Sequence, residues 1–142
     1  MKHIDYLYFN IYNYFHSTSQ YKESFNVRIQ AMYLFALGSG GWLLLMEALY
    51  LHLIRHSWFP SRAASTIFAA SLYLLTAVLS NYIFIVKDRD QLIFGKYEEL
   101  FNNNPKRKRH LFISAIVLVI PYLVLLSFAI FYPGAGSRYI RA

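Results

Sequence analysis

The sequence predicts an all-α membrane protein with three transmembrane helices and short amphipathic helices on the cytoplasmic side. Apolar residues make up 57% of the 142 residues, and charged residues make up only 15%. The apolar residues are also concentrated in blocks, at 29–54, 63–86 and 111–132. Each block has the ~20 or more residues that a helix needs to cross ~30 Å of hydrocarbon. Three such blocks in so short a chain leave too little polar surface for a soluble globular domain.

Residues 1–28 precede the first block and are rich in aromatic side chains. The apolar residues that recur at helical spacing there are Ile4, Leu7, Tyr8, Ile11 and Phe15. This pattern is typical of an amphipathic helix that lies in the interface of a bilayer. Ser17, with Gln20 three positions later, is typical of a helix N-terminus, so we expect a new helix to run from about Thr18 into the first span.

The first span, residues 29–54, contains a single charged side chain, Glu47. A charged residue near the centre of a span costs roughly 2.5–3.5 kcal/mol, which makes Glu47 a candidate functional residue. Two interpretations stay open. Glu47 either joins helices, protonated or bonded to a tyrosine such as Tyr73 or Tyr122, or it faces a water-filled path.

Small and polar residues line one face of each of the first two spans. In the first span, Tyr33 and Gly40 share the face of Glu47. In the second span the repeating positions are Thr66, Ala70, Tyr73, Ala77 and Ser80. Small residues let helices approach closely in lipid, so these faces predict contacts between the two spans or between copies. We take Tyr33, Gly40, Thr66, Tyr73 and Ser80 with Glu47 as pore or gating candidates.

A short outer turn at residues 55–62 leads into the second span, 63–86, and residues 87–110 then form an amphipathic helix and a basic run. The apolar stripe of this helix is expected at Leu92, Ile93, Tyr97, Leu100 and Phe101, with Asp88, Asp90 and other charged residues on the remaining faces. An amphipathic helix outside the bilayer needs a cover for its apolar face. Residues 1–28 or another copy of the chain would supply it.

Four consecutive cations, Lys106, Arg107, Lys108 and Arg109, stand directly before the third span. The first interpretation of these cations is that they set the orientation of the chain in the membrane and attract anionic lipid. The attraction contributes ~1 kcal/mol per residue near the membrane surface. The alternative is a cytoplasmic site for an anionic ligand or a partner protein. The sequence carries no strong nucleic-acid signal.

The third span, residues 111–132, contains Pro121, another gating candidate. Proline cannot donate a backbone hydrogen bond to the carbonyl of Val117, so we expect a bend at this point. Neighbouring Ser or Tyr side chains are expected to bond to the freed carbonyl.

Positive charges are distributed unevenly about the three spans. Of the 14 Lys and Arg residues, three lie in residues 1–28 and seven in 87–110, and the other four are Arg55, Arg62, Arg138 and Arg141. Because Lys and Arg are enriched in cytoplasmic loops, the N-terminus is predicted in the cytoplasm and the tail, 133–142, outside the plasma (inner) membrane. An outer aromatic belt is expected at Trp58, Tyr132 and Tyr139.

Catalytic and cofactor signatures are absent from the sequence, so no catalytic residue and no cofactor are predicted and the protein is not expected to be an enzyme. Cysteine is absent, and His52 with His56 does not complete a metal site. The size and layout of the chain resemble a broad group of small bacterial multi-span proteins, including membrane-disrupting effectors of phage defence. No site residue is carried over from that resemblance.

Two functions fit these features. The first is a homo-oligomeric ion channel or membrane-permeabilising effector, gated from a cytoplasmic aromatic and basic layer. The second is a non-catalytic accessory or scaffold subunit of a larger membrane complex. Three helices of this size cannot enclose a pore alone, so the first function requires a homo-oligomer.

Overall fold

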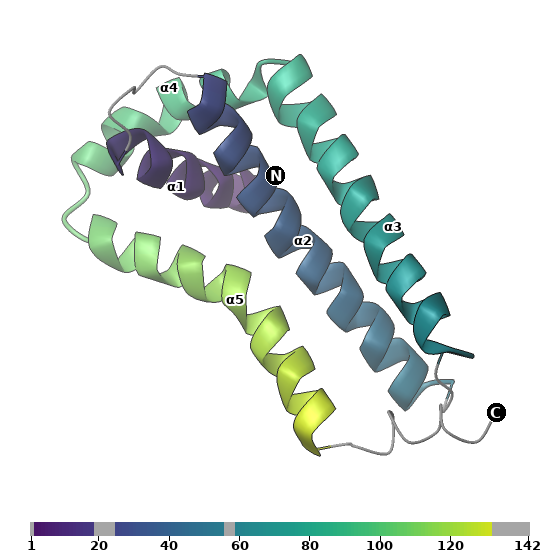
Figure 1. The fold of residues 1–142 in the computed structure, drawn as a ribbon. Helices are drawn as coiled ribbons and strands as arrows, with labels where there is room; N and C mark the ends of the chain where they lie inside the picture. Colours follow the sequence, from purple (N-terminus) through teal and green to yellow (C-terminus); the bar gives the residue numbers. More distant parts are fainter. Residues whose placement is uncertain (1, 19–24, 56–58, 132–142) are drawn as a thin grey trace.

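The computed structural model describes residues 2–18, 25–55 and 59–131, and every regular element in these ranges is a helix (Figure 1). In chain order the elements are α1 (Lys2–Thr18), α2 (Phe25–Leu53), α3 (Arg62–Ser80), the π-helical η1 (Asn81–Val86), α4 (Arg89–Asn102) and α5 (Arg107–Phe131). Three helical stretches are long and apolar enough to cross a membrane: Phe25–Leu53, Arg62–Val86 and Arg107–Ile130. The all-helical class and the three candidate spans are therefore confirmed.

The junction between α1 and α2 differs from the prediction. Ser17 and Thr18 belong to the last turn of α1, where both hydroxyls donate to the carbonyl of Tyr14. The expected helix start at Ser17 is wrong, because a Ser or Thr hydroxyl can bond back to a carbonyl of its own helix as well as cap the next one. α2 begins at Phe25, before the predicted start of the first span.

Several predictions fall outside the described residues. They concern Gln20, His56, the aromatic belt at Trp58, Tyr132 and Tyr139, and the tail at 133–142.

The best-packed part of the protein lies at one end of the three long helices (Figure 1). There α1 packs against α4 and against the adjoining parts of α2 and α5. The buried side chains of this core are Tyr8, Phe9, Ile11, Tyr12, Val27, Ala31, Phe84, Ile93 and Phe101. We call this end, formed by α1, α4, η1 and the parts of α2 and α5 that pack on them, the aromatic layer. Of the two covers expected for the amphipathic helix, the chain uses its own N-terminal segment.

The middle of α1 is buried on all sides. Tyr8 and Phe9 are fully buried, and Asn10 is 2% exposed, although these neighbours point in different directions around the helix. The middle of α1 is therefore a core segment, whereas its spacing had suggested a helix with a single apolar face. The reason is that aromatic residues at consecutive positions give it apolar surface on more than one side.

Only part of the stripe predicted for α4 is buried. Ile93 and Phe101 are each 5% exposed, whereas Leu92 is 73% exposed and Leu100 is 64% exposed. The buried face of α4 also includes Asp90, which is completely buried. The prediction that Asp90 lies on an exposed polar face of the helix is therefore wrong.

A buried ion pair explains the position of Asp90. The guanidinium of Arg28, near the start of α2, donates from Nε to Asp90 Oδ2 at 2.6 Å and from Nη2 to Asp90 Oδ1 at 2.9 Å. The same Nη2 also reaches Asp88 Oδ1 at 2.7 Å. Asp88 sits in the sharp turn between η1 and α4, with a positive φ of 48° that Asp tolerates better than most residues. The pair therefore fixes the direction in which α4 leaves the second long helix.

Two further polar contacts attach α1 to its neighbours. Asp5 accepts an ion pair from Arg89 Nη2 at 2.7 Å, at the start of α4. Asn10 Nδ2 donates to Ser114 Oγ in α5 at 2.8 Å. The Tyr8 ring stacks on Phe84 of η1 with centroids 3.8 Å apart. Each of α4, α5 and η1 is thus joined to α1 by a specific side-chain contact.

We predict that Asp90→Asn destabilises the protein far more than Asp88→Asn. Breaking a buried ion pair by neutralising one partner costs about 3–5 kcal/mol, and Arg28 would then keep only its exposed partner, Asp88. The Asp88 side chain is 66% exposed, and an exposed ion pair contributes about 1 kcal/mol or less. The free energy of unfolding, measured by denaturing-detergent titration in mixed micelles, compares the two variants.

Asn is tolerated at a positive φ, so Asp88→Asn is a matched control that keeps the turn. Equal losses from the two variants would show that the burial of Asp90 does not set the strength of this contact.

Candidate functional site

Two tyrosines pack directly against glycines in the middle of α2. A Cβ atom added at Gly40 would lie 2.6 Å from Tyr73 Cδ1 of α3, and one added at Gly41 would lie 2.8 Å from Tyr122 Cε2 of α5. Such distances do not occur in real structures, so both rings occupy space that only glycine leaves. α2 is therefore the central helix, and its small residues serve contacts within the chain.

The hydroxyls of these tyrosines form a short hydrogen-bonded chain across the three helices. Tyr73 Oη donates to Tyr122 Oη at 3.0 Å, and Tyr122 Oη donates to the Leu37 carbonyl of α2 at 2.7 Å. Both hydroxyl protons are thereby used. The proposed bond from either tyrosine to Glu47 is accordingly not formed.

Glu47 is half-buried on α2, and within the described ranges it forms no hydrogen bond and no ion pair. Seven residues separate it from Gly40, which is two helical turns or ~10 Å, so both lie on nearly the same side of α2. Gly40 faces α3. The carboxylate therefore belongs to the α2–α3 side of the molecule and has no partner within the described chain.

Pro121 lies inside α5 and is fully buried, and α5 bends along its length (Figure 1). Proline leaves the carbonyl of residue i−4 without its usual donor, and such sites are where helices bend. That carbonyl belongs to Val117, and Trp42 Nε1 of α2 donates to it at 2.9 Å. The bond expected from a Ser or Tyr is supplied instead by a tryptophan.

Two of the remaining pore candidates, Tyr33 and Ser80, lie away from Glu47. Tyr33 lies 14 residues from Glu47 on α2, about 21 Å along the helix, and is 53% exposed. Thr66 is exposed, and its hydroxyl donates to the Arg62 carbonyl of its own helix at 3.0 Å. Ser80 is 5% exposed at the other end of α3. The structure brings Gly40 and Tyr73 of the predicted set into direct contact.

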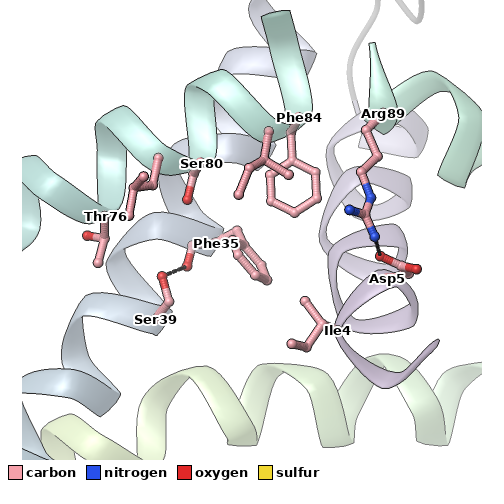
Figure 2. A pocket seen from close by; sticks show the side chains of 10 residues that line it. Ile4, Asp5, Phe35, Ser39, Thr76, Ser80, Phe84 and Arg89 are labelled. Atoms are coloured by element: carbon pink, nitrogen blue, oxygen red, sulfur yellow. Dashed lines mark hydrogen bonds and ion pairs between the residues drawn. The ribbon is translucent and has the colours of Figure 1, made fainter. Parts of the chain in front are cut away.

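Ser80 instead lines a groove between α2 and α3 beside the aromatic layer (Figure 2). The groove has a volume of about 310 Å³ and a mostly apolar lining. Its lining residues are Ile4, Asp5, Phe35, Ser39, Thr76, Leu79, Ser80, Ile83, Phe84 and Arg89. Figure 2 shows hydroxyl groups toward one end and the Asp5–Arg89 ion pair at the other.

The basic run stands at the start of α5. Lys106, Arg107, Lys108 and Arg109 are all exposed, and within the described residues none of them forms an ion pair. Their charges are therefore available to an anion. A ligand for these residues stays a prediction.

The aromatic layer also contains buried polar atoms. Within the described chain, Tyr8 Oη and Asn10 Oδ1 are buried without a hydrogen-bond partner. Burial is the main cause that raises the pKa of the Tyr8 phenol far above its usual range, and the nearby Asp90 carboxylate raises it further. The Tyr8 hydroxyl therefore stays neutral at every physiological pH.

Sequence reasoning missed the ion pairs of Arg28 with Asp90 and of Asp5 with Arg89. A signal was present. Arg28 lies at the start of a long apolar helix, so its charge needs an acidic partner, and that partner must lie where the neighbouring span ends on the same side. The sequence there reads Lys87-Asp88-Arg89-Asp90. Whether Asp88 or Asp90 is the buried carboxylate depends on the direction of the turn at Asp88.

We predict that Trp42→Phe lowers the free energy of unfolding by about 1 kcal/mol, as is typical of an interhelical hydrogen bond in a membrane. In a Pro121→Ala background the new backbone N–H of residue 121 can bond to Val117. Trp42→Phe should then cost much less. The coupling is measured as a double-mutant cycle in mixed micelles.

The same loss in both backgrounds would mean that Trp42 acts through packing of its ring and not through the Val117 carbonyl.

Compared with known proteins, the chain matches no protein-family model, no curated protein and no solved structure. Across the described residues, no three His, Cys, Asp or Glu side chains come together in a group that could hold a metal ion. The function is therefore argued from the residues of this chain and their geometry.

Proposed function

We propose that the chain is an integral membrane protein that assembles with copies of itself into an ion channel or membrane-permeabilising pore. Its N-terminus and aromatic layer lie on the cytoplasmic side of the plasma (inner) membrane. The observation that carries this proposal is Glu47, a carboxylate within an apolar helix that has no partner in the described chain. Both tyrosines that could have bonded to it are engaged elsewhere.

A carboxylate in hydrocarbon without a partner is costly, and such residues almost always face a bundle interior or a water-filled cavity. In one chain, Glu47 is only half-buried. In a ring of copies, the α2–α3 side can face a central path, where water and other copies would solvate the carboxylate. This arrangement accounts for an ionisable group on that side.

The exposed surface of the long helices supports assembly. Within one chain, only 17% of the most apolar 18-residue stretch of Arg62–Val86 is buried. The corresponding stretch of Arg107–Ile130 is only 6% buried. These helices have whole faces left for lipid and for other copies. Closed cyclic rings are the commonest arrangement for identical subunits.

The aromatic layer is suited to a gating role. It is joined to the long helices by the Arg28–Asp90 ion pair and the Asn10–Ser114 hydrogen bond. A change at its surface is therefore transmitted to α2 and α5. The exposed cations at 106–109 would be the point where an anionic ligand acts on it.

A second function, an accessory subunit of a larger membrane complex, is favoured by one surface. One side of α5 carries a run of exposed apolar residues that could dock on another membrane protein. Its members include Phe112, Ile116, Val119, Leu123, Leu126 and Ile130. Reconstitution of the chain alone discriminates the two, since a channel passes ions without a partner and an accessory subunit does not.

We predict the membrane orientation from single cysteines, because the chain contains none of its own. Ala63→Cys, at the exposed start of α3, should react with a membrane-impermeant maleimide in intact cells. Ser17→Cys, exposed at the end of α1, should react only after the cells are opened. The reverse pattern would place the aromatic layer outside.

We predict that Glu47→Gln leaves assembly intact and changes ion flux. Gln keeps the shape and most of the hydrogen-bonding capacity while removing the ionisable group, so cation preference and the pH response should fall. Flux into liposomes that contain the purified protein is measured as a function of pH, for the unaltered chain and for the variant.

Glu47→Leu is the companion variant. If Glu47 only joins copies, Leu weakens assembly by roughly 0.6–2 kcal/mol, and Gln leaves flux unaltered at every pH. That pair of results would remove the main support for the channel.

A further inference from the structure

We propose that the groove between α2 and α3 binds one acyl chain of a membrane phospholipid, and that Arg89 binds the phosphate of the same lipid. This inference rests on the proposed insertion into a membrane but not on ion conduction. It assigns a ligand to a site that neither Glu47 nor the tyrosine contacts occupy.

The lining of the groove suits a hydrocarbon chain. Leu79, Ile83, Phe35 and Phe84 are among its apolar lining residues, and its volume of about 310 Å³ is at the lower end of the ~300–1,000 Å³ typical of ligand pockets. An apolar occupant gains from burial in proportion to the apolar area it covers. The chemistry of the wall thus excludes a strongly hydrated ligand from the body of the groove.

Two of the three hydroxyls that line the groove are already engaged by backbone carbonyls. Ser39 Oγ donates to the Phe35 and Ala36 carbonyls at 3.0 Å, and Thr76 Oγ1 donates to the Tyr73 carbonyl at 3.0 Å. Both protons are directed into the backbone of their own helices. These side chains therefore present little donor capacity to an occupant, and an acyl chain requires none.

The groove lies at the depth of a single leaflet. From Thr76 to Ile83 it follows the second long helix for seven residues, or ~10 Å. Half of a ~30 Å hydrocarbon core is ~15 Å. The ion pair of Asp5 with Arg89 closes the end nearest the aromatic layer (Figure 2). A lipid of that leaflet would have its head group at this end and its chain along the groove.

The groove is open sideways to the bilayer. Leu79 is 50% exposed and Ile83 is 36% exposed, and the neighbouring Val78 is 57% exposed. The rim is thus part of the surface that faces lipid in a membrane. A chain can enter from the side without displacing a helix.

Arg89 provides the recognition of a phosphate. Its side chain is 32% exposed, and Nη2 pairs with Asp5. A guanidinium carries five N–H donors in a planar fork that matches a phosphate, so one ion pair leaves donors for a second anion. Arg89 can hold Asp5 and a phosphate together, or exchange one for the other.

Charge favours a lipid over a second copy of the chain at this position. The chain carries a net charge of +7, so a second copy that approaches Arg89 is repelled by the net charge of the first. A phospholipid instead brings a negative phosphate. Electrostatic complementarity therefore selects the lipid.

The test is photolabelling of the full chain in vesicles of phosphatidylglycerol and phosphatidylcholine. A trace of phosphatidylglycerol carries a diazirine on its acyl chain, and labelled residues are located by mass spectrometry. Labelling should concentrate on the groove-lining residues of α2 and α3. Uniform labelling of all the exposed apolar residues of the three long helices would overturn the proposal, as would crosslinks between copies across the groove.

Four variants test the two halves of the site. Leu79→Trp narrows the groove and should lower its labelling about five- to tenfold, whereas Val78→Trp, one residue away on the lipid-facing surface, should not. Arg89→Gln should lower labelling by a similar factor, and Asp5→Asn should raise it or leave it unchanged because it releases the guanidinium.

The difference in labelling between Arg89→Gln and Asp5→Asn is decisive. If the Asp5–Arg89 contact were purely structural, both variants would break the same ion pair and lower labelling alike, and that result would overturn the role of Arg89. Circular dichroism of each variant shows that the helices are retained. Because labelling is read without ion flux, the channel proposal can fail while this site is confirmed.

Discussion

The ion pair between Arg28 and Asp90 is the contact on which the arrangement of the helices depends. Asp90 is completely buried, so its charge can exist there only because Arg28 neutralises it with two hydrogen bonds. This pair fixes where α4 turns after η1, and α4 in turn forms one wall around α1. The buried aromatic core of α1 is consequently assembled around a salt bridge between the start of α2 and the first turn of α4.

The molecule divides into two parts that are held together by different forces. In the aromatic layer, Tyr8, Phe9 and their neighbours are buried as they would be in a small soluble domain, where removal of apolar surface from water drives packing. Beyond this layer, α3 and α5 both continue alongside α2 (Figure 1). There the contacts include a tyrosine ring against a glycine and a hydroxyl or indole that donates to a carbonyl. Such contacts suit a lipid environment, which offers no hydrophobic gain for joining apolar helices.

The helical class and the three candidate spans could be predicted because they depend on length and hydropathy alone. The cover of α4 by α1 could be narrowed to two alternatives, since an apolar stripe must face something. Other features depend on direction in space. The spacing of residues 4–15 could not show that α1 is surrounded, because the helices that surround it come from distant parts of the chain. Glu47 could be identified from the sequence as an ionisable residue in a span. Whether a tyrosine hydroxyl was free to bond to it could not, because that depends on the register between α2, α3 and α5.

The bond from Trp42 to the Val117 carbonyl limits how α5 can move. In most helices the hydrogen bond of each carbonyl is internal, so a helix can tilt away from its neighbour without losing it. Here the acceptor belongs to α5 and the donor to α2, so separating the two helices leaves the carbonyl without a donor. Rotation of α5 about the indole as a pivot preserves the bond, whereas outward tilting at this level breaks it. Any conformational change of the third long helix is therefore expected to swing its two halves about Trp42, with the halves on either side of Pro121 moving separately.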